Sequence, residues 1–219
     1  RATEEQISSE EFNLPKYTRS MSEAIKKGYS GVCIYAKEDV SKIRNTFGCK
    51  FFKDEGRFIE IELPKVRIVS VYFPSGSSGD VRQNLKYEFM KKFEKYMRRI
   101  KKSNKPTIIS GDWNIVHKEI DIKNWKSNQK NSGCLPKERE WLDKIFNNLG
   151  FVDAFREVNN KPHNYTWWSN RGKSWDNNVG WRIDYQVFSP NSQINVKSAS
   201  IYKRKRFSDH SPLIIRYEF

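Results

Sequence analysis

A short apolar run that ends at a glycine, followed by an aspartate and an asparagine, constrains this chain more than any other feature. Thr107–Ile109 is a mostly β-branched run typical of a buried strand, and Gly111 allows a sharp turn directly after it. Asp112 and Asn114 lie two positions apart, so both side chains leave the strand end on one side. Ligands of α/β sheets collect outside the carboxyl ends of strands. The stretch therefore predicts either a site for a divalent cation and a phosphate, or an Asx turn that caps the next segment.

The periodicity of apolar residues predicts several strands around this stretch. Phe58–Leu63 alternates strictly, which predicts a strand with one wet face, paired as an antiparallel hairpin with Val66–Phe73. Arg1–Ser20 has no clear period and is expected to be a loop with at most one helical turn. Further strands are expected at Gly31–Lys37, Trp181–Phe188, Ile194–Tyr202 and Pro212–Phe219.

Two helices complete the predicted set of elements. From Arg82 to Asn104, apolar residues recur at spacings of three and four, and the other face carries lysines and arginines, Lys86 among them, that are expected to be exposed. The second helix is expected over Pro136–Leu149, with proline at its start and Gly150 as its stop. Since no repeat or linker interrupts the chain, we expect residues 1–219 to form a single α/β domain of two packed, mostly antiparallel sheets flanked by helices.

The charge narrows the class of partner. The chain has 41 Lys and Arg against 26 Asp and Glu, a net charge of +15, and 14% of its residues are aromatic. Such a basic excess is typical of proteins with a polyanionic partner, although it also fits a merely soluble surface. Aromatic groups interleaved with cations favour nucleic acid. The 3 cysteines lack C-x-x-C spacing, which fits free thiols in a reducing compartment, and no apolar run approaches a membrane span, so no membrane partner is expected.

Two further positions combine groups that suit proton handling. Asp209 and His210 follow a basic run and precede a strand, and Asp184 lies in an otherwise apolar strand. A buried carboxylate needs a partner, and the pair of His210 with Asp184 is the natural one, because the carboxylate fixes the orientation of the imidazole. The alternative for Asp209 and His210 is an ordinary turn with a capping aspartate.

Tryptophans and cations share the loops before and after residue 175. Trp167 and Trp181 lie in or beside loops rather than at helical spacing, so a pocket wall competes with core packing as their interpretation. Their polar neighbours favour a stacking pocket beside phosphate contacts. The candidate contacts are Arg171, Lys173, Asn178 and Arg182.

Four motifs in a fixed order resemble the exonuclease III family of apurinic/apyrimidinic (AP) endonucleases. They are Ser-Gly-Asp-Trp-Asn at 110–114, Tyr-Thr-Trp-Trp at 165–168, Val-Gly-Trp-Arg-Ile-Asp-Tyr at 179–185 and Ser-Asp-His-Ser-Pro-Leu at 208–213. Tyr-Phe-Pro-Ser-Gly at 72–76 and Leu-Pro-Lys-Glu-Arg-Glu-Trp at 135–141 resemble the family too. The ordered set spans essentially the whole chain and is highly specific. Gly-Asp-x-Asn and Ser-Asp-His alone would mark only the wider endonuclease/exonuclease/phosphatase superfamily.

This resemblance implies a four-layer α/β sandwich with Mg²⁺ or Mn²⁺ at the lip of its two sheets. By matched position, Asp112 is expected to activate the attacking water, and Asn114 to orient that water and hold the developing charge. His210, aligned by Asp184, is expected to contact the scissile phosphate, and Asp209 to belong to the metal cluster. The implied metal ligands are Asp112, Asn114, Asp209 and His210.

The resemblance also implies a substrate and an activity. Tyr72 is expected against the phosphate or leaving group, and Trp167 and Trp181 in the wall of a pocket for a flipped abasic sugar. The implied activity is metal-dependent hydrolysis of the phosphodiester 5′ to an abasic site, with 3′→5′ exonuclease and 3′-phosphodiesterase activities as further expectations. The expected partner is double-stranded DNA with abasic sites or 3′ ends, bound by a monomer wherever genomic DNA resides, in a bacterium the cytoplasm and its nucleoid. A non-catalytic DNA-binding protein, or another nuclease or phosphatase of the superfamily, stays an open alternative.

One departure from the family pattern concerns the start of the chain. Family members begin with a strand that carries a metal-site asparagine, and a second strand then ends in Leu-Gln-Glu, whose glutamate binds the metal. Neither is found here, and Arg1–Thr3 looks like the residues directly after that glutamate. We therefore expect the domain to be N-terminally incomplete over residues 1–219, and these residues alone to fold poorly and show little Mg²⁺-dependent cleavage.

Overall fold

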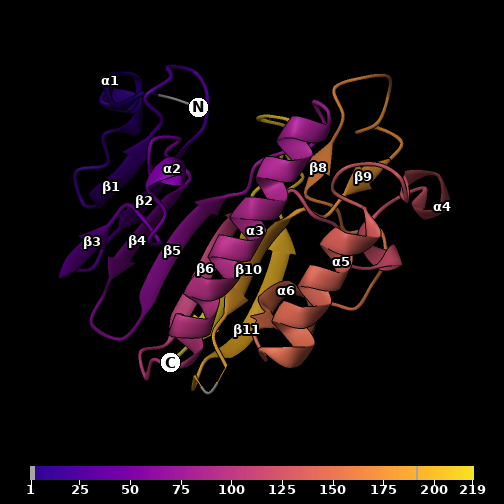
Figure 1. Ribbon diagram of the computed structural model, residues 1–219. Coiled ribbons are helices and arrows are strands. Elements are labelled where there is room, and N and C mark those ends of the chain that lie inside the picture. Colours follow the sequence, from indigo (N-terminus) through magenta and orange to yellow (C-terminus); the bar gives the residue numbers. More distant parts are fainter. Residues whose placement is uncertain (1–2, 191) are drawn as a thin grey trace.

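The computed structural model describes residues 3–190 and 192–219, so Arg1, Ala2 and Asn191 lie outside the described residues. Its centre is a sheet of six strands in the order β3-β4-β5-β6-β10-β7 (Figure 1). Strands β5 and β6 are parallel, and the other neighbours are antiparallel. The strands are β3 (Lys42–Arg44), β4 (Phe58–Glu62), β5 (Arg67–Tyr72), β6 (Thr107–Asp112), β10 (Asp184–Phe188) and β7 (Val152–Asp153). The predicted hairpin is thus confirmed as β4 and β5, but the prediction that β4 has one wet face is wrong, because Glu60 is buried where Arg44 and Tyr96 donate to it.

Three antiparallel pairs accompany this sheet. They are β1 (Thr18–Glu23) with β2 (Gly31–Ala36), β11 (Asn195–Ile201) with β12 (Leu213–Glu218), and β8 (Trp167–Trp168) with β9 (Gly180–Trp181). Strand β1 corrects the prediction that its segment is loop, because its buried positions are Ser20 and Ser22 and carry no apolar period. The strand expected over residues 181–188 is divided between β9 and β10.

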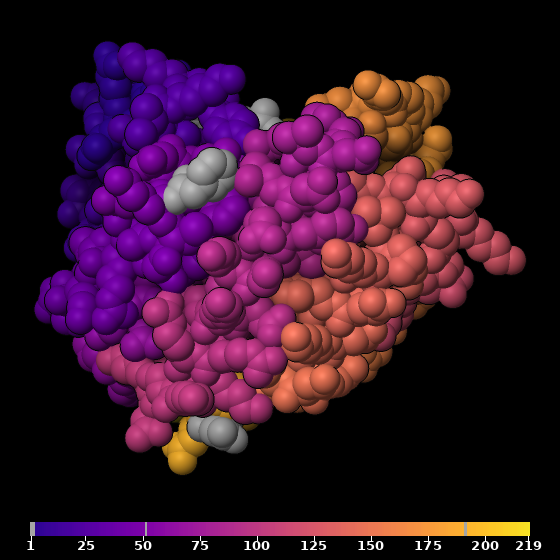
Figure 2. Space-filling view, in the orientation of Figure 1, coloured from indigo at the N-terminus to yellow at the C-terminus, as the bar shows by residue number. Residues whose placement is uncertain are grey.

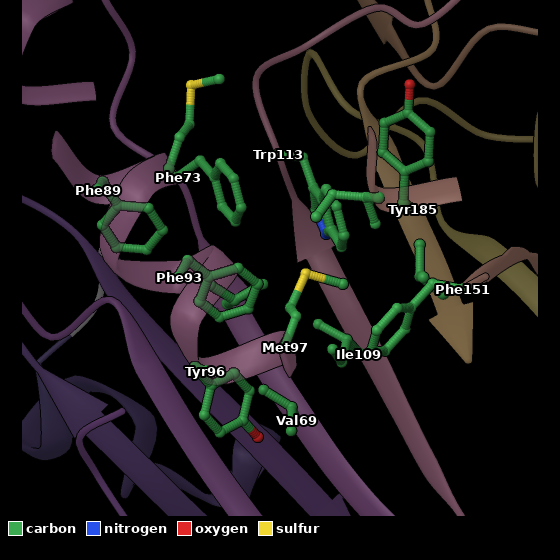
Figure 3. Close-up of a cluster of buried hydrophobic side chains, with 14 of the residues drawn as sticks. Val69, Phe73, Phe89, Phe93, Tyr96, Met97, Ile109, Trp113, Phe151 and Tyr185 are labelled. Carbon is green, nitrogen blue, oxygen red and sulfur yellow. The ribbon is translucent and has the colours of Figure 1, made fainter. Parts of the chain in front are cut away.

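Helices cover one face of the central sheet. Helix α3 (Asp80–Lys101) lies across it beside α5 (Pro136–Asp143), whose last turn continues as the π-helix η3 (Lys144–Asn148) (Figures 1 and 2). Phe89, Phe93 and Met97 of α3 pack against Val69 and Ile109 of the sheet in one aromatic-rich core (Figure 3). Both predicted helices are confirmed, but Lys86 is fully buried rather than exposed.

The opposite face of the sheet carries a second core. Ile108 and Phe188 point to this side, where they pack with Ala154 of α6 (Ala154–Val158) and Val196 of β11. The mixed α/β fold with helices outside strands is therefore confirmed. The remaining short helices are α1 (Glu4–Ile7), η1 (Glu10–Phe12), α2 (Lys50–Lys53), η2 (Glu119–Asp121) and α4 (Trp125–Asn128). In the described part of the chain, no helix is both long and apolar enough to cross a membrane.

Strand register brings three polar side chains to one end of the sheet. Tyr72 ends β5 directly beside Asp112, which ends the parallel strand β6. Asp184 begins the antiparallel strand β10 and also pairs with Asp112. Strand β5 approaches so closely that a Cβ on Gly111 would lie 1.8 Å from the carbonyl oxygen of Val71, which only a glycine tolerates. The predicted glycine stop thus serves close strand packing at the sheet end.

Candidate active site

A cavity of about 880 Å³ opens at this end of the sheet. Its walls come from the loops after β5 and β6, the start of α3, the segment before α5, and the β8, β9 and β12 connections. Eight residues singled out from the sequence line it: Tyr72, Asp112, Asn114, Trp167, Arg171, Trp181, Asp209 and His210. The fold therefore gathers in one cavity side chains that lie up to 138 positions apart (210 − 72) in the chain.

Asp112 and Asn114 form a rigid unit at the cavity wall. The backbone N–H of Asn114 donates to Oδ1 of Asp112 at 2.8 Å, and its side-chain Nδ2 donates to Oδ2 at 3.0 Å. The same Nδ2 donates to the carbonyl oxygen of Phe73 at 2.9 Å. The Asx turn is thus confirmed and forms part of the cavity wall, while the site for a cation and a phosphate stays a prediction. Asn114 has a φ of 51°, a conformation that asparagine adopts more readily than most residues.

His210 and Asp184 form the predicted pair. Nδ1 of His210 lies 2.9 Å from Oδ2 of Asp184, with the histidine on the turn before β12. Burial alone would lower the pKa of His210, but the hydrogen bond to Asp184 and the charges of Asp184 and Asp112 raise it to about 9. The imidazole is therefore a cation at neutral pH, with Nδ1 held by the carboxylate and Nε2 left to serve as a donor toward a ligand.

The charge of Asp112 responds to the same cluster. Burial, together with the negative charge of Asp184, raises the pKa of Asp112 to about 7, while His210 and the backbone N–H of Asn114 oppose the rise. A carboxyl group with a pKa near neutrality can accept a proton and release it again, as a general base must.

Tyr72 is held by Arg57, which sequence reasoning missed. Arg57 is only 2% exposed, and its Nη1 donates to the carbonyl oxygen of Tyr72 at 3.1 Å. The backbone N–H of Tyr72 donates in return to the carbonyl oxygen of Arg57 at 2.9 Å, and the guanidinium lies 5.2 Å from the centre of the tyrosine ring. The signal in the sequence is an arginine directly before the apolar run of β4.

Trp167 and Trp181 face one another across the β8–β9 pair. They are register partners, their ring centroids lie 5.9 Å apart, and their planes meet at 84°. Nε1 of Trp167 donates to Oδ2 of Asp209 at 3.1 Å, and Trp167 also forms a β-bridge with His210. The two half-buried rings meet at right angles beside the polar cluster, and they also pack against a small buried core that includes Val116 and Ile183. Their role as the wall of a sugar pocket stays a prediction.

The four candidate phosphate contacts lie in different environments. Arg171 lines the cavity, and Lys173 is exposed on the same loop. The side chain of Asn178 already accepts from Nε1 of Trp168 and donates to the carbonyl oxygen of His163, so it braces the loop. The prediction that Arg182 contacts DNA is wrong, because this residue is fully buried.

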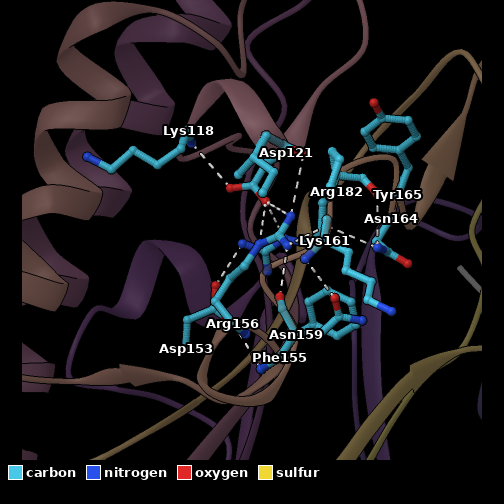
Figure 4. Close-up of polar contacts among 12 residues, drawn as sticks. Lys118, Asp121, Asp153, Phe155, Arg156, Asn159, Lys161, Asn164, Tyr165 and Arg182 are labelled. Atoms are coloured by element: carbon cyan, nitrogen blue, oxygen red, sulfur yellow. Dashed lines mark hydrogen bonds and ion pairs between the residues drawn. The ribbon is translucent and has the colours of Figure 1, made fainter.

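Arg182 belongs to an internal ionic network instead (Figure 4). Its Nε donates to Oδ1 of Asp121 and its Nη2 to Oδ2 of Asp153, each at 2.7 Å. Arg156 reaches the same Asp121 oxygen at 2.6 Å. Arg182 lies in the short break between β9 and β10, where its side chain turns inward to Asp121 and Asp153.

The donor types at the cavity suit a hard divalent cation. Asp112 and Asp209 supply carboxylates and Asn114 an amide oxygen, and all three line the cavity. Within residues 3–190 and 192–219, no three His, Cys, Asp or Glu side chains are arranged to enclose a metal ion. Mg²⁺ keeps several waters and needs only one or two carboxylates, and the predicted ligand set stays a prediction.

Comparisons with known proteins identify the family. A profile of the Endonuclease/Exonuclease/phosphatase family matches residues 7–210. The chain belongs to this endonuclease/exonuclease/phosphatase family. Within it, the exodeoxyribonuclease of Bacillus subtilis is 37% identical over 191 residues, which are 87% of this chain and 75% of that protein. The DNA repair nuclease APEX1 of Danio rerio is 35% identical over 191 residues, 87% of this chain and 61% of that protein. The resemblance found in the motifs is thus confirmed.

Solved structures show the same fold. The structure of an AP endonuclease from Archaeoglobus fulgidus superimposes with a TM-score of 0.82 at 23% identity, over 94% of this chain and 80% of that one. A 3′-5′ exonuclease from Neisseria meningitidis has a TM-score of 0.84 at 20% identity and covers 100% of this chain and 86% of that one. At such identities the likeness concerns architecture, which agrees with the mixed α/β fold described above.

Proposed function

We propose that this protein is a metal-dependent DNA repair nuclease that hydrolyses the phosphodiester bond 5′ to an abasic site. One observation carries the proposal: a cationic imidazole, a carboxylate of near-neutral pKa and two perpendicular tryptophans line one cavity. The cationic imidazole suits a phosphate, and the carboxylate suits an attacking water. The two tryptophans suit an extruded sugar that has no base. The relatives named for exodeoxyribonuclease and DNA repair nuclease activity support this choice.

In the proposed hydrolysis, each polar side chain of the cavity has a separate role. The carboxylate of Asp112 takes a proton from the attacking water, while the amide of Asn114 holds both carboxylate oxygens in place. The imidazolium of His210, fixed by Asp184, donates to a non-bridging phosphate oxygen as negative charge develops there. The water oxygen bonds to phosphorus as the phosphorus–O3′ bond breaks, and the leaving O3′ takes a proton from solvent water to become a 3′-hydroxyl. Tyr72 lies beside Asp112 at the sheet end and is placed to contact the phosphate or this leaving oxygen.

A divalent cation, Mg²⁺ or Mn²⁺, would add a fixed positive charge near the phosphate when bound beside Asp112 and Asp209. The substrate in this proposal is double-stranded DNA with abasic sites or 3′ ends, bound by one copy of the chain. Arg171 at the cavity and Lys173 on the same exposed loop provide cations for its backbone. The site of action is then wherever genomic DNA resides, in a bacterium the cytoplasm and its nucleoid.

Two alternatives remain distinguishable by experiment. A phosphatase for small esters needs no tryptophan wall, and a DNA-binding protein without catalysis needs no carboxylate of raised pKa. A 3′ phosphatase from Neisseria shares the fold at a TM-score of 0.81 and 22% identity, so 3′-end processing deserves its own substrate in the test. We include 3′→5′ exonuclease and 3′-phosphodiesterase action in the proposal for this reason.

A cleavage assay tests the proposal directly. The protein is incubated with Mg²⁺ and four substrates: an abasic duplex, an undamaged duplex, a duplex with a 3′-phosphate, and p-nitrophenyl phosphate. Parallel reactions contain EDTA. We expect EDTA-sensitive nicking of the abasic duplex 5′ to the lesion by the full-length protein, and little action on the small ester. Binding of DNA without any cleavage would support the non-catalytic alternative, and preferential hydrolysis of the small ester would support the phosphatase.

A further inference from the structure

A buried ion pair lies next to Asn114 in the wall of the cavity. Lys86 of α3 and Glu138 of α5 pair through Nζ and Oε1, and both side chains are 0% exposed. Their contact joins the two helices that cover the sheet. An ion pair in this position is weak support for stability, because the loss of hydration offsets most of the attraction, and apolar residues often serve as well. The pair therefore calls for another explanation.

Lys86 reaches the catalytic asparagine. Its Nζ donates to the backbone carbonyl oxygen of Asn114 at 2.7 Å. That carbonyl belongs to a residue with a φ of 51°, which the chain adopts only when its surroundings hold it. The amide groups of Asn114 in turn fix both oxygens of Asp112. Lys86 thus bonds directly to Asn114, and Asn114 bonds directly to the Asp112 carboxylate that accepts the proton.

Glu138 holds the facing segment of the cavity wall. Its Oε2 accepts from the backbone N–H groups of Gly133 at 2.7 Å and Leu135 at 3.0 Å, and its Oε1 accepts from Nε2 of Gln83 at 3.1 Å. Gly133 lies against both parts of the site, since a Cβ there would be 2.9 Å from the carbonyl oxygen of Asn114 and 3.1 Å from the ring of Trp181. One carboxylate therefore sets the spacing between the asparagine and the tryptophan wall.

We propose that Lys86 and Glu138 are a pair of positioning residues that hold Asn114 and Gly133 in register for catalysis. A helix cap at the start of α5 would need the glutamate alone, and a helix contact would need no charge. Only the lysine reaches from Glu138 to the Asn114 carbonyl. The inference rests on the proposed function, because the consequence of lost register is read from cleavage of the abasic duplex.

The test uses variants that remove both charges together. Lys86→Met alone would leave Glu138 buried without a partner and risk misfolding, so the main variant is Lys86→Met with Glu138→Gln. It is made in the wild-type and in the Asn114→Ala background, and Glu138→Gln alone is the milder second variant. The matched control is Tyr96→Phe, which removes a buried contact of the same helix, the 2.6 Å bond to Glu60, far from the cavity. Single-turnover rate, apparent Kd for the abasic duplex and Tm are measured for each.

We expect the charge-free pair to cut about 10 to 100 times more slowly with a Kd changed by less than about threefold, as misplaced catalytic groups do. In the Asn114→Ala background, the charge-free pair should slow cleavage by less than about a further threefold. The ion pair and Asn114 act as one unit, so the effect of the pair is lost when the Asn114 side chain is absent. Tyr96→Phe should lower Tm without lowering the rate in either background.

Four results separate the possible failures. A folded charge-free pair that cuts at the wild-type rate overturns the inference, as does a loss of equal size in both backgrounds. If Glu138→Gln alone folds and behaves as the wild type, the part assigned to Glu138 is overturned in the same way. If Asn114→Ala itself keeps the wild-type rate, the fault lies in the proposed catalytic role of Asn114, on which the inference depends.

Discussion

In the proposed mechanism Asp112 accepts a proton and His210 donates a hydrogen bond, and each group shifts the pKa of the other. The pKa of Asp112 is raised to about 7 by burial and by Asp184, and that of His210 to about 9 by its contact with Asp184 against the effect of burial. Between these two values the carboxyl group is ionised and the imidazole is protonated. A base and an acid thus coexist at one phosphate near neutral pH.

The first prediction concerns this carboxylate. Asp112→Asn removes the proton acceptor and one negative charge that faces phosphate, so turnover should fall by roughly 10²- to 10⁴-fold while DNA affinity is kept or increased. Single-turnover cleavage of an abasic duplex and fluorescence-anisotropy binding measure the two effects separately. A variant that cuts at nearly the wild-type rate would show that Asp112 is a structural Asx cap only.

The second prediction concerns the tryptophan wall. Trp181→Ala removes one of the two perpendicular rings but leaves the phosphate contacts in place, so cleavage at abasic sites should decline more than binding to undamaged duplex does. The comparison needs both substrates at one salt concentration. Equal losses on the two would mean that Trp181 acts as core packing rather than as a pocket wall.

At the scale of elements, an ionic network fastens the loop after β6 to the start of β10. Asp121 in η2 is 1% exposed and is held by Arg182 and Arg156, and Arg182 also binds Asp153 before α6. Burial alone would raise the pKa of Asp121, but the charges of Arg182 and Arg156 lower it to about 2. The network joins three short elements that have little apolar surface of their own, and it sets the path that leads into Trp181 and Asp184.

The third prediction follows from that pKa. A carboxyl group whose pKa is lowered on folding from 3.8 to about 2 adds stability that is fully present above about pH 4 and is lost as the pH falls toward 2. Asp121→Asn should therefore lower the free energy of unfolding at pH 7 by about 3–5 kcal/mol, because Arg182 is left buried without its main partner. Urea denaturation at pH 7 and at pH 3 checks this, with a smaller difference expected at the lower pH. The same difference at both values would contradict the ionic explanation.

At the scale of the whole molecule, the net charge of +15 is expected to affect the binding of DNA rather than the rate of its cleavage. The run Lys203–Arg206 is exposed and precedes Asp209 at the cavity, and Arg206 bonds to Asn170 on the neighbouring loop. Lys91 and Lys92 are exposed on α3, and neither lines the cavity. Two basic surfaces of the same type thus differ in their position relative to the site.

The fourth prediction compares these surfaces. Affinity for undamaged duplex should fall roughly 10³-fold or more between 50 and 200 mM salt if about six phosphates are contacted. Arg204→Gln with Lys205→Gln should reduce the slope of log K against log salt by about 2, while Lys91→Gln with Lys92→Gln, an equal change of charge, should leave it unchanged. Equal slopes for the two double variants would show that the basic run beside the cavity plays no special part in binding.

Local pattern was sufficient for much of this protein. The stripe of α3 follows from the burial of one helix face, which is a property of neighbouring residues. The apolar run of β6 and the alternation of β4 also predicted strands, although both faces of β4 are buried and not the apolar one alone. The ordered motifs contain seven of the eight predicted residues that line the cavity, all except Arg171, because most groups that do phosphate chemistry are polar and close to glycine turns. Pairing of His210 with Asp184 was also foreseeable, since a carboxylate in an apolar strand requires a partner.

Tertiary structure alone decided which charges turn inward. Arg182 and Lys86 have the same local appearance as the exposed cations around them, yet both are fully buried, because Asp121, Asp153 and Glu138 approach from distant parts of the chain. Strand β1 was missed for the related reason that serines form its buried face. A buried charge or hydroxyl is stabilised by partners that the fold brings to it, so its position depends on long-range contacts rather than on its neighbours in the sequence.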